Sequence, residues 1–566
     1  MADPITIRDI DLTPLPGKTY TSVDREWREE FIYFLMVDRF HDDTDRAPIP
    51  QNERLAGFPA LDGFYGGTIR GIARNLAYIA GLGCTAIWLS PVFETNAYHG
   101  YDTTNYLAID PRFGTKQDLV ELVDAAHGFV RDGQHWPMRV ILDVVINHSG
   151  DNWSYADGDR TYQNDEWFAF GAWRRPDRPV PTELRNEELY HRRGRITDGW
   201  DRYPENQHGD LYGLKDYAND DDAAGSTLIN ILIAAHCYWI READVDGFRV
   251  DAVKHMGELA CARFCSNVRE YAYALGKRGF FLFGEVASPD DEIYDRYIGQ
   301  NTSRQDGNTT VFFGLNSVLD FRLAQGSGGD NAPLRQVILG QAGPQTLMNR
   351  LDAQRDRALN RGEIGRYLVT FVDNHDAFWQ PGGRIAAEAD DAQVIGAVGY
   401  LLCALGTPCL YYGTEQGFAG HGGDVAMREA MFDRDAPGRN LLNPDCAIYR
   451  EIAAIAAVVR ATPALRFGRM YVRPISGDGQ HFGPPFGTAY TLAFARMLYG
   501  REVLVAYNVS DQPRSDAVVV SAEFHTDGDR LAYRYGGAGD VAVDVAADGT
   551  HFVRLPLAPH QFVVLA

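Results

Sequence analysis

The sequence contains little cysteine. Only seven cysteines occur among 566 residues, most of them inside apolar segments: Cys84, Cys237, Cys261, Cys265, Cys403, Cys409 and Cys446. An odd number in such surroundings excludes a fully paired disulfide framework and predicts buried free thiols. Free thiols favour a cytoplasmic protein. A secreted or periplasmic location stays open, because an export signal that had been removed would leave the same pattern.

Long apolar runs and basic charge are also scarce. No segment approaches the ~18 apolar residues of a membrane span, and the first residues, MADPITIRDIDLTPLPGK, show no basic start followed by an apolar stretch. Lysine and arginine total 54 against 77 acidic residues, which gives a net charge of −23. This charge repels a polyanion, and no basic run with interleaved aromatics offsets it. We therefore expect neither nucleic acid nor a membrane as a partner.

The composition that remains is typical of a packed globular protein. Hydrophobic residues make up 45% of the chain and charged residues 23%, which excludes a disordered or fibrous class. One α/β barrel with insertions can take up ~400 residues. The length therefore predicts two or three structural units.

Short apolar runs rich in β-forming residues alternate with longer helical patterns. The eight runs cover 31–37, 84–90, 138–145, 246–250, 280–286, 311–318, 367–373 and 408–412. Nearly continuous hydrophobic strands are expected where both faces of a sheet are buried, and eight strand–helix repeats suit a closed barrel. The fold class predicted is α/β, a (β/α)8 TIM barrel.

The repeat pattern changes at two places. After the third strand a long stretch rich in Asp, Arg, Trp and Tyr precedes the next clear helix, predicted over 226–243. A plain loop of that length is unusual in a compact domain, so we predict a small inserted domain over 149–225. From residue 465 onward, alternating runs broken by Gly, Asp and Pro predict a C-terminal antiparallel β-sandwich over 465–566. The barrel then comprises 1–148 and 226–464.

Polar residues gather where four of the predicted strands end. The groups are Asp143 with Asn147 and His148, Arg249 with Asp251, Lys254 and His255, Glu285, and Asp373 with His375 and Asp376. Each group alone would usually be a helix cap or a turn. Catalytic groups of such a barrel come from the carboxyl ends of several strands. Four groups in order, one to a strand, therefore indicate an active site.

The fragments DVVINH, GFRVDAVKH, GEV and FVDNHD resemble the four main motifs of the α-amylase family, in the same order and with the same long insertion. Further similarity lies in GFYGGTIRGI (63–72), AYHGYD (97–102) and GTPCLYYGTEQG (406–417). The resemblance covers nearly the whole chain. It implies a retaining glycoside hydrolase acting on α-1,4-linked glucans such as starch, glycogen or maltooligosaccharides.

The resemblance also implies roles for single residues. Asp251 would be the nucleophile, Glu285 the acid/base, and Asp376 the third carboxylate that binds sugar hydroxyls. Asp143 would support the site structurally. The substrate-binding residues implied are His99, Tyr101, His148, Arg249, Lys254, His255 and His375. In the family, a Lys–His pair like that at 254–255 accompanies α-1,4-specific amylases and some glucan transferases. An ordinary solvated lysine with a capping histidine is the alternative.

The residue types suit this chemistry independently of the resemblance. Retaining cleavage needs an ionised carboxylate that attacks the anomeric carbon and a protonated carboxyl group that assists the leaving oxygen. Arg249 lies two residues before Asp251, on the same strand face, so we expect it to keep that aspartate charged. Glu285 follows the apolar run FFLFG, and poor solvation is expected to raise its proton affinity. A buried ion pair without catalysis is the alternative.

Calcium is the cofactor that the resemblance implies. Its ligands would be Asn147, Asp216 and the backbone carbonyl of His255, although Lys215 stands where the family commonly has proline. Oxygen ligands from separate loops suit a hard cation. A second calcium loop would use Asp38, Asp43 and Asp45. Relatives with that loop supply an aspartate where this chain has Thr68, so a solvated acidic loop is the alternative.

Several alternatives stay open at the level of sequence. A transglycosylase would use the same intermediate, with a sugar hydroxyl in place of water, and a non-catalytic glucan-binding protein could keep the same barrel. The aromatic residues Trp153, Tyr155, Tyr162, Trp167 and Trp173 form either the core of the inserted domain or a rim on which sugars stack. The sequence predicts no oligomeric state.

Overall fold

Eight parallel strands form the centre of the computed structural model, which describes residues 3–49, 57–58, 62–288, 290–305, 308–324, 326–327, 330–361, 368–377, 383–436 and 439–566. Their order is β17-β14-β13-β8-β3-β1-β21-β20, and a parallel bridge between Leu319 and Val369 joins the two ends of this sheet. Every residue of these strands is buried. The predicted (β/α)8 barrel is confirmed, and burial on both faces explains the apolar strand sequences.

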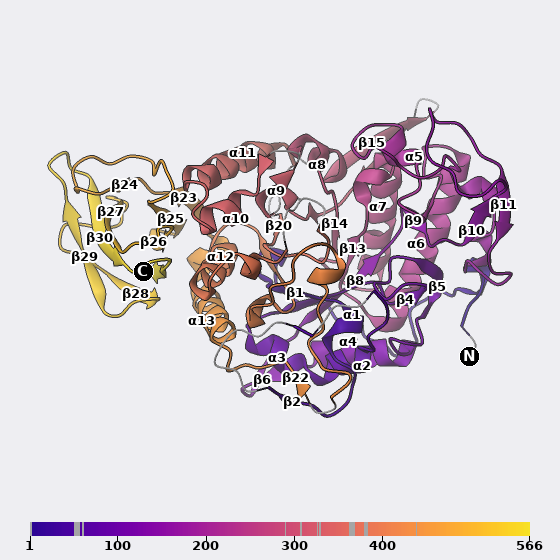
Figure 1. Cartoon of the computed structure of the whole chain (residues 1–566), viewed down its shortest axis with the longest axis horizontal. Helices are drawn as coiled ribbons and strands as arrows, with labels where there is room; N and C mark the ends of the chain where they lie inside the picture. The colour runs from indigo at the N-terminus through magenta and orange to yellow at the C-terminus, as the bar shows by residue number, and fades with distance from the viewer. Residues whose placement is uncertain are drawn as a thin grey trace.

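The barrel strands lie close to the eight predicted runs. They are β1 (Ile32–Leu35), β3 (Ala86–Leu89), β8 (Arg139–Val144), β13 (Gly247–Val250), β14 (Phe281–Gly284), β17 (Ser317–Val318), β20 (Val369–Thr370) and β21 (Thr407–Tyr411). The principal helices around them are α2 (Ile69–Arg74), α3 (Leu76–Gly81), α4 (Lys116–His127), α6 (Ala223–Ala243), α7 (Glu258–Ala274), α8 (Asp291–Tyr297), α10 (Pro333–Ile338), α11 (Gln345–Arg361), α12 (Asp391–Cys403) and α13 (Ala447–Ala461) (Figure 1).

The sixth strand differs from its prediction over 311–318. The first three residues of that run belong to β16 (Asn308–Phe313), which pairs antiparallel with β15 (Gln300–Gln305) in a hairpin outside the barrel. Only Ser317–Val318 joins the barrel sheet. Val311 and Phe313 are 43% and 46% exposed. The run 311–318 therefore combines an exposed hairpin strand and a buried barrel strand, which hydrophobicity alone does not separate.

Helix α6 is the longest helix of the described residues. It begins where Asp222 accepts a hydrogen bond from the Gly225 amide, and it ends at Asp244, whose φ is +62°. By length and composition α6 could cross a membrane, although the sequence showed no fully apolar run of that length. Within the fold, 61% of its apolar window is buried. It packs against α4, α7 and β5 (Thr103–Ile109) as a core helix.

The segment between β8 and α6 forms a separate layer beside the barrel. It contains β9 (His148–Ser149), β10 (Trp153–Tyr155), β11 (Phe170–Trp173), α5 (Glu205–His208) and β12 (Lys215–Asp216), with β9 paired to β12 and β10 to β11. Trp153 is fully buried and contacts the rings of Tyr155 and Tyr190, whereas Trp167 is 51% exposed. The aromatics therefore serve mainly as a core. The limits 149–225 remain a prediction.

The C-terminal part is an antiparallel sheet of nine strands, as predicted in kind. The strands are β23 (Arg469–Val472), β24 (Ile475–Ser476), β25 (Thr491–Leu498), β26 (Arg501–Asn508), β27 (Arg514–Val519), β28 (Arg530–Tyr535), β29 (Asp540–Val545), β30 (His551–Leu557) and β31 (Phe562–Leu565). Figure 1 shows this sheet at one end of the long axis and the β10–β11 hairpin at the other. The Arg496 guanidinium joins the sheet to the barrel by donating to the carbonyl groups of Cys403, Ala404 and Gly468 at 2.6–3.0 Å.

Residues 3–30 run along the outside of the molecule and contact all of its parts. The Ile7 amide donates to Glu183 of the inserted segment at 3.1 Å. Lys18 donates to the Glu242 carbonyl at the end of α6, at 3.1 Å. Glu29 pairs with Arg466 at 2.5 Å, next to the C-terminal sheet. This segment therefore spans the barrel from the inserted layer to the C-terminal sheet.

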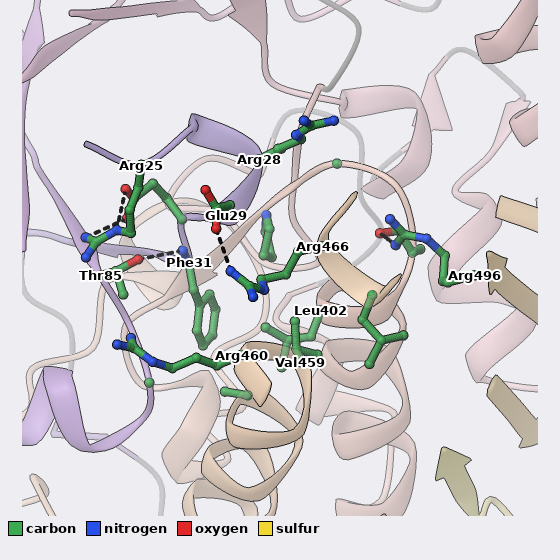
Figure 2. A pocket seen from close by; sticks show the side chains of 17 residues that line it. Arg25, Arg28, Glu29, Phe31, Thr85, Leu402, Val459, Arg460, Arg466 and Arg496 are labelled. Atoms are coloured by element: carbon green, nitrogen blue, oxygen red, sulfur yellow. Dashed lines mark hydrogen bonds and ion pairs between the residues drawn. The ribbon is translucent and has the colours of Figure 1, made fainter. Parts of the chain in front are cut away.

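All seven cysteines are buried and free, as predicted. A cavity of about 230 Å³ lies at the opposite end of the barrel from the polar motifs, where Phe31 and Thr85 precede β1 and β3 (Figure 2). Its lining includes Arg25, Arg28, Arg460, Arg466 and Arg496. Arg25 pairs with Glu30 at 3.1 Å and Arg466 with Glu29. Much of this positive charge is therefore neutralised in place.

Candidate active site

The predicted catalytic residues come together at the carboxyl ends of the barrel strands. Strands β8, β13 and β14 are neighbours, and their register sets Arg249 opposite Asp143 on one side and Phe283 on the other. Asp251 and Glu285 follow β13 and β14 directly. Asp376 arrives from the segment after β20. The side chains of Asp143, Arg249, Asp251, Glu285 and Asp376 are between 0% and 13% exposed.

The guanidinium of Arg249 is the centre of this group. Its Nη1 lies 2.9 Å from Asp143 Oδ1 and 2.6 Å from Asp251 Oδ1, and its Nη2 lies 2.9 Å from Glu285 Oε2. The Ala252 amide donates to the same Glu285 oxygen at 3.0 Å. One fully buried cation therefore contacts three carboxylates and fixes the spacing between Asp251 and Glu285.

The buried carboxylates hold protons more tightly than isolated ones. Burial raises the pKa of Asp251 well above its ordinary value, and the charge of Glu285 adds to the rise, whereas Arg249 lowers it. Burial likewise raises the pKa of Asp143 to about 6. The sequence predicted that Arg249 helps to keep Asp251 ionised, and in the structure the charge of Arg249 acts in that direction. The loss of water on burial, which the prediction left out, acts against it.

Asp376 is held by a residue that the sequence did not reveal. Arg428 Nη2 lies 2.7 Å from Asp376 Oδ1, and Arg428 Nε donates to the His375 carbonyl at 3.0 Å. The His375 ring lies 3.3 Å from Asp376 Oδ2. Arg428 belongs to a loop after β21 that carries no motif, so only the folded path of that loop brings it here.

Tyr101 links the two halves of the site. Its hydroxyl donates to Asp143 Oδ2 at 2.9 Å and lies 2.8 Å from His375 Nε2. Trp88 Nε1 also donates to Asp143, at 3.1 Å, and was not predicted. The His99 ring stacks on Tyr101, with centroids 5.7 Å apart. The structure thus brings His99, Tyr101 and His375 together beside the carboxylates.

The histidines of the site are neutral near pH 7. Burial lowers the pKa of His148 to about 4 and that of His99 to about 3. Burial and the nearby Arg428 and Arg249 charges lower the pKa of His375 well below its ordinary value. Neutral imidazoles can both donate and accept hydrogen bonds. That property suits the recognition of hydroxyl groups.

Lys254 and His255 tie the barrel to the inserted segment. Lys254 Nζ lies 2.9 Å from Asp201 Oδ1, and His255 Nδ1 lies 2.7 Å from the Asn206 carbonyl. Next to them, the Trp200 ring lies 6.1 Å from His255, edge to face, and 5.3 Å from the ring of Tyr212. Burial and the charges of Asp424, Asp376 and Glu285 raise the pKa of Tyr212.

Tyr212 is 60% exposed, so it and Trp200 form an aromatic rim beside the carboxylates. The sequence prediction named other aromatics and missed these two. A Trp and a Tyr within the polar segment 197–214 gave no periodic signal that could have singled them out.

Asn147 and Asp216, two of the predicted calcium ligands, are in contact. Asn147 Nδ2 donates to Asp216 Oδ1 at 3.3 Å, and the Tyr217 amide donates to the Asn147 carbonyl at 3.0 Å. The other amide atom, Asn147 Oδ1, is buried and has no hydrogen-bond partner among the described residues. An orphaned carbonyl oxygen beside a buried carboxylate fits the oxygen ligands that calcium prefers. The third predicted ligand is the carbonyl of His255, the last residue of η5 (Val253–His255).

The aspartates of the second predicted calcium loop contact protein groups in the structure. Asp38 accepts hydrogen bonds from the amides of Tyr65 and Gly66 at 2.8 and 3.1 Å. Asp43 and Asp45 both pair with Arg74, at 2.5 and 3.0 Å. Among the described residues, the group of His, Cys, Asp and Glu ligands close enough to hold one ion does not include these aspartates. Local arginine and amide donors therefore take up the charges that the prediction assigned to a cation.

The barrel with three carboxylates at its carboxyl ends defines the class of (β/α)8 glycoside hydrolases. Residues 34–442 match the family described as "Alpha amylase, catalytic domain", and the chain therefore belongs to the α-amylase family.

Curated relatives include α-amylases and cyclomaltodextrin glucanotransferases. The chain is 29% identical over 611 aligned residues to an α-amylase of Streptomyces lividans, an alignment that covers 94% of this chain and 60% of that protein. It is 27% identical to a cyclomaltodextrin glucanotransferase of Klebsiella oxytoca, with 80% of this chain and 67% of that protein covered. The chain thus spans about 60% of the length of the Streptomyces relative.

Solved structures agree on the fold. The α-amylase of Geobacillus thermoleovorans complexed with acarbose superposes with a TM-score of 0.68 at 24% identity, covering 96% of this chain and 99% of that chain. A cyclomaltodextrin glucanotransferase with a three-domain ABC distribution gives a TM-score of 0.67 at 24% identity. These likenesses extend over the barrel, the inserted segment and the C-terminal sheet.

Proposed function

We propose that this protein hydrolyses α-1,4-glucosidic bonds in starch, glycogen or maltooligosaccharides with retention of anomeric configuration. The observation that carries the proposal is the single guanidinium of Arg249, which contacts both Asp251 and Glu285, opposite an Asp376 held by Arg428. Retaining enzymes need two carboxyl groups at close spacing with one proton between them. The contact of one guanidinium with both Asp251 and Glu285 brings these two carboxyl groups close together and supports the assignment.

The two steps follow from the positions of these groups. Asp251 attacks the anomeric carbon while Glu285 gives its proton to the leaving oxygen, and a glycosyl–aspartate ester forms. Glu285, now ionised, takes a proton from water, whose oxygen displaces Asp251 with a second inversion. Asp376 accepts hydrogen bonds from the sugar hydroxyls as the ring flattens. At the end of the second step Asp251 is again a free carboxylate and Glu285 has regained its proton.

The ester intermediate also supports transglycosylation as a second function. Relatives of this chain include cyclomaltodextrin glucanotransferases. The exposed rim of Trp200 and Tyr212 offers flat faces beside Lys254 and His255 on which an acceptor sugar could stack. Longer or cyclic products from concentrated maltooligosaccharide would support transfer over hydrolysis. A purely glucan-binding protein is less supported, because all three carboxylates are present.

We also propose calcium as a structural cofactor. Asn147, Asp216 and the His255 carbonyl would hold the ion, which would join the inserted segment to the barrel. The buried, unpartnered Asn147 Oδ1 supports this assignment. Calcium would supply charge and rigidity, with no part in bond cleavage. Chelation is expected to lower the melting temperature, and added calcium to restore it.

The test of the proposed function is the product profile of maltoheptaose, followed by proton NMR. The intact protein is expected to release short products as α-anomers. Glu285→Gln removes the proton donor, so kcat is expected to fall by about 10²–10⁴-fold. The exposed Glu270, on α7, gives the matched control Glu270→Gln, which is expected to keep full activity. Products released as β-anomers, or full activity in Glu285→Gln, would contradict the mechanism.

A further inference from the structure

A second group of chemically reactive side chains lies in the inserted segment. His191, His208 and Asp220 place one ligand atom each within 4.8 Å of one another. His191 Nε2 lies 2.9 Å from Asp220 Oδ2, and His208 Nε2 lies 3.7 Å from Asp220 Oδ1. The two imidazole rings lie 4.5 Å apart. Both Nε2 atoms therefore face one carboxylate.

The other nitrogen of each imidazole is held by a second carboxylate. His191 Nδ1 lies 2.5 Å from Asp216 Oδ2, and His208 Nδ1 lies 2.9 Å from Asp165 Oδ1. A histidine that binds a metal nearly always donates its remaining N–H to a carboxylate or carbonyl group, which fixes the tautomer and strengthens the ligand. Here both histidines have that arrangement. Both Nε2 atoms point toward Asp220, where His191 Nε2 is hydrogen-bonded to Oδ2 in the absence of an ion.

The separations suit a tetrahedral ion. Zinc bound at about 2.0–2.2 Å by nitrogen and carboxylate ligands has neighbouring ligand atoms about 3.3–3.5 Å apart. The observed 2.9 and 3.7 Å lie on either side of that range. His208 Nε2 is buried without a hydrogen-bond partner in the described part of the chain. Asp220 is half exposed, so an ion can enter from solvent.

We propose that His191, His208 and Asp220 form a zinc site, with water in the fourth position. Two imidazoles and one carboxylate suit zinc, whereas calcium prefers oxygen ligands. Three aspartates, Asp165, Asp216 and Asp220, contact these two histidines, so the site is rich in negative charge and suits a divalent cation. Asp216 lies between this site and the calcium position, because its Oδ1 faces Asn147 and its Oδ2 faces His191.

The zinc site would join three parts of the inserted segment beside His255 of the barrel. His191 follows η4 (Glu187–Leu189), His208 ends α5 and Asp220 precedes α6. Helix α5 also carries the Asn206 carbonyl, 2.7 Å from His255 Nδ1. An ion at His208 would therefore fix the helix against which His255 rests. Zinc is expected to order the sugar-binding face without entering the reaction.

Binding can be measured on the full chain by calorimetric titration with zinc, after chelation and in saturating calcium. One equivalent is expected to bind. Cobalt in its place is expected to give the visible absorption of a tetrahedral ion with nitrogen and oxygen ligands. His208→Ala and Asp220→Asn are expected to weaken zinc binding at least 100-fold. Asp165→Asn, which removes only the support of His208, is expected to weaken it by about 10–100-fold.

Two variants serve as matched controls. Asp221→Asn alters the neighbouring exposed aspartate, and His481→Gln alters an exposed histidine of the C-terminal sheet. Both are expected to bind zinc as the parent does. Asp220→Asn preserves shape, and its circular dichroism separates lost binding from lost folding. Absence of stoichiometric zinc binding by the parent, or unchanged affinity in His208→Ala and Asp220→Asn, would overturn the proposal.

Discussion

At the scale of single residues, the site depends on two buried arginines that hold the carboxylates in position. Arg249 contacts three carboxylates, and Arg428 holds Asp376 and the backbone at His375. Arg249 lies two residues before Asp251 in the sequence, so strand periodicity was enough to place both on one face. Arg428 lies 52 positions after Asp376, in a loop without a motif. Its role follows only from the folded path of the chain.

Replacement of Arg428 tests whether Asp376 needs this contact for its role. Arg428→Gln removes a charged hydrogen bond to Asp376, worth about 1.5–3 kcal/mol. If that energy is used in the transition state, kcat/KM is expected to fall by about 10–100-fold. The control Arg434→Gln, at a partly exposed arginine of the same loop region, is expected to keep its activity. An unchanged kcat/KM in Arg428→Gln would show that Asp376 needs no such anchor.

At the scale of elements, the sequence correctly predicted the positions of the strands that are followed by the polar motifs. Strand ends meet at one edge of a barrel, so order along the chain was enough to group Asp143, Asp251 and Glu285. The run 311–318 failed because hydrophobicity does not distinguish the exposed β16 from the buried β17. The pairing of Asp43 and Asp45 with Arg74 could not be predicted, because it depends on where α2 packs. The second calcium loop stays a prediction.

Helix α6 carries a buried histidine that links stability to pH. His236 contacts the rings of Phe93, Tyr106, Phe248 and Phe264, with centroids 5.4–5.9 Å away. Burial lowers its pKa to about 4 from 6.5. Between these values the unfolded chain binds a proton that the folded chain does not. Stability is therefore full above pH 6.5 and is lost as the pH falls toward 4.

His236→Gln cannot take up this proton, so its stability is expected to depend less on pH. The difference in the free energy of unfolding between the parent and His236→Gln should narrow by up to about 3 kcal/mol as the pH falls from 7 to 4. Urea unfolding across that range measures it, with His135→Gln on the exposed β7 hairpin (Gln134–His135) as control. Parallel stability curves for the parent and His236→Gln would show that His236 is protonated equally in both states.

At the scale of the whole molecule, the barrel and the C-terminal sheet are joined by polar as well as apolar contacts. Arg496 projects from β25 and donates to three carbonyl groups at the ends of α12 and α14 (Pro463–Phe467). Tyr507 and Phe562 pack directly against Gly396 and Gly399 of α12. Since a side chain at either glycine would collide with these rings, α12 and the sheet meet at close backbone distance.

Because Arg496 donates to these carbonyl groups at the junction, we expect its replacement to lower the stability of the protein. Arg496→Met keeps an unbranched apolar stem but removes the guanidinium and leaves buried acceptors without these donors, at a cost of about 1–3 kcal/mol each. The melting temperature is expected to fall by several degrees, and the sheet should become sensitive to protease first. Arg501→Met alters an exposed arginine of the next strand and serves as control. Equal melting of the two variants would contradict this role for Arg496.

The path of residues 3–30 has a consequence for how the parts of the molecule separate. Their contacts lie on Glu183 of the inserted segment, on Glu242 of α6 and on Arg466 of α14. Because one continuous segment contacts all three places, movement of any one part away from the others breaks contacts of this segment. Residues 3–30 therefore oppose independent unfolding of the inserted segment, the barrel and the C-terminal sheet, and couple the three into one cooperative unit.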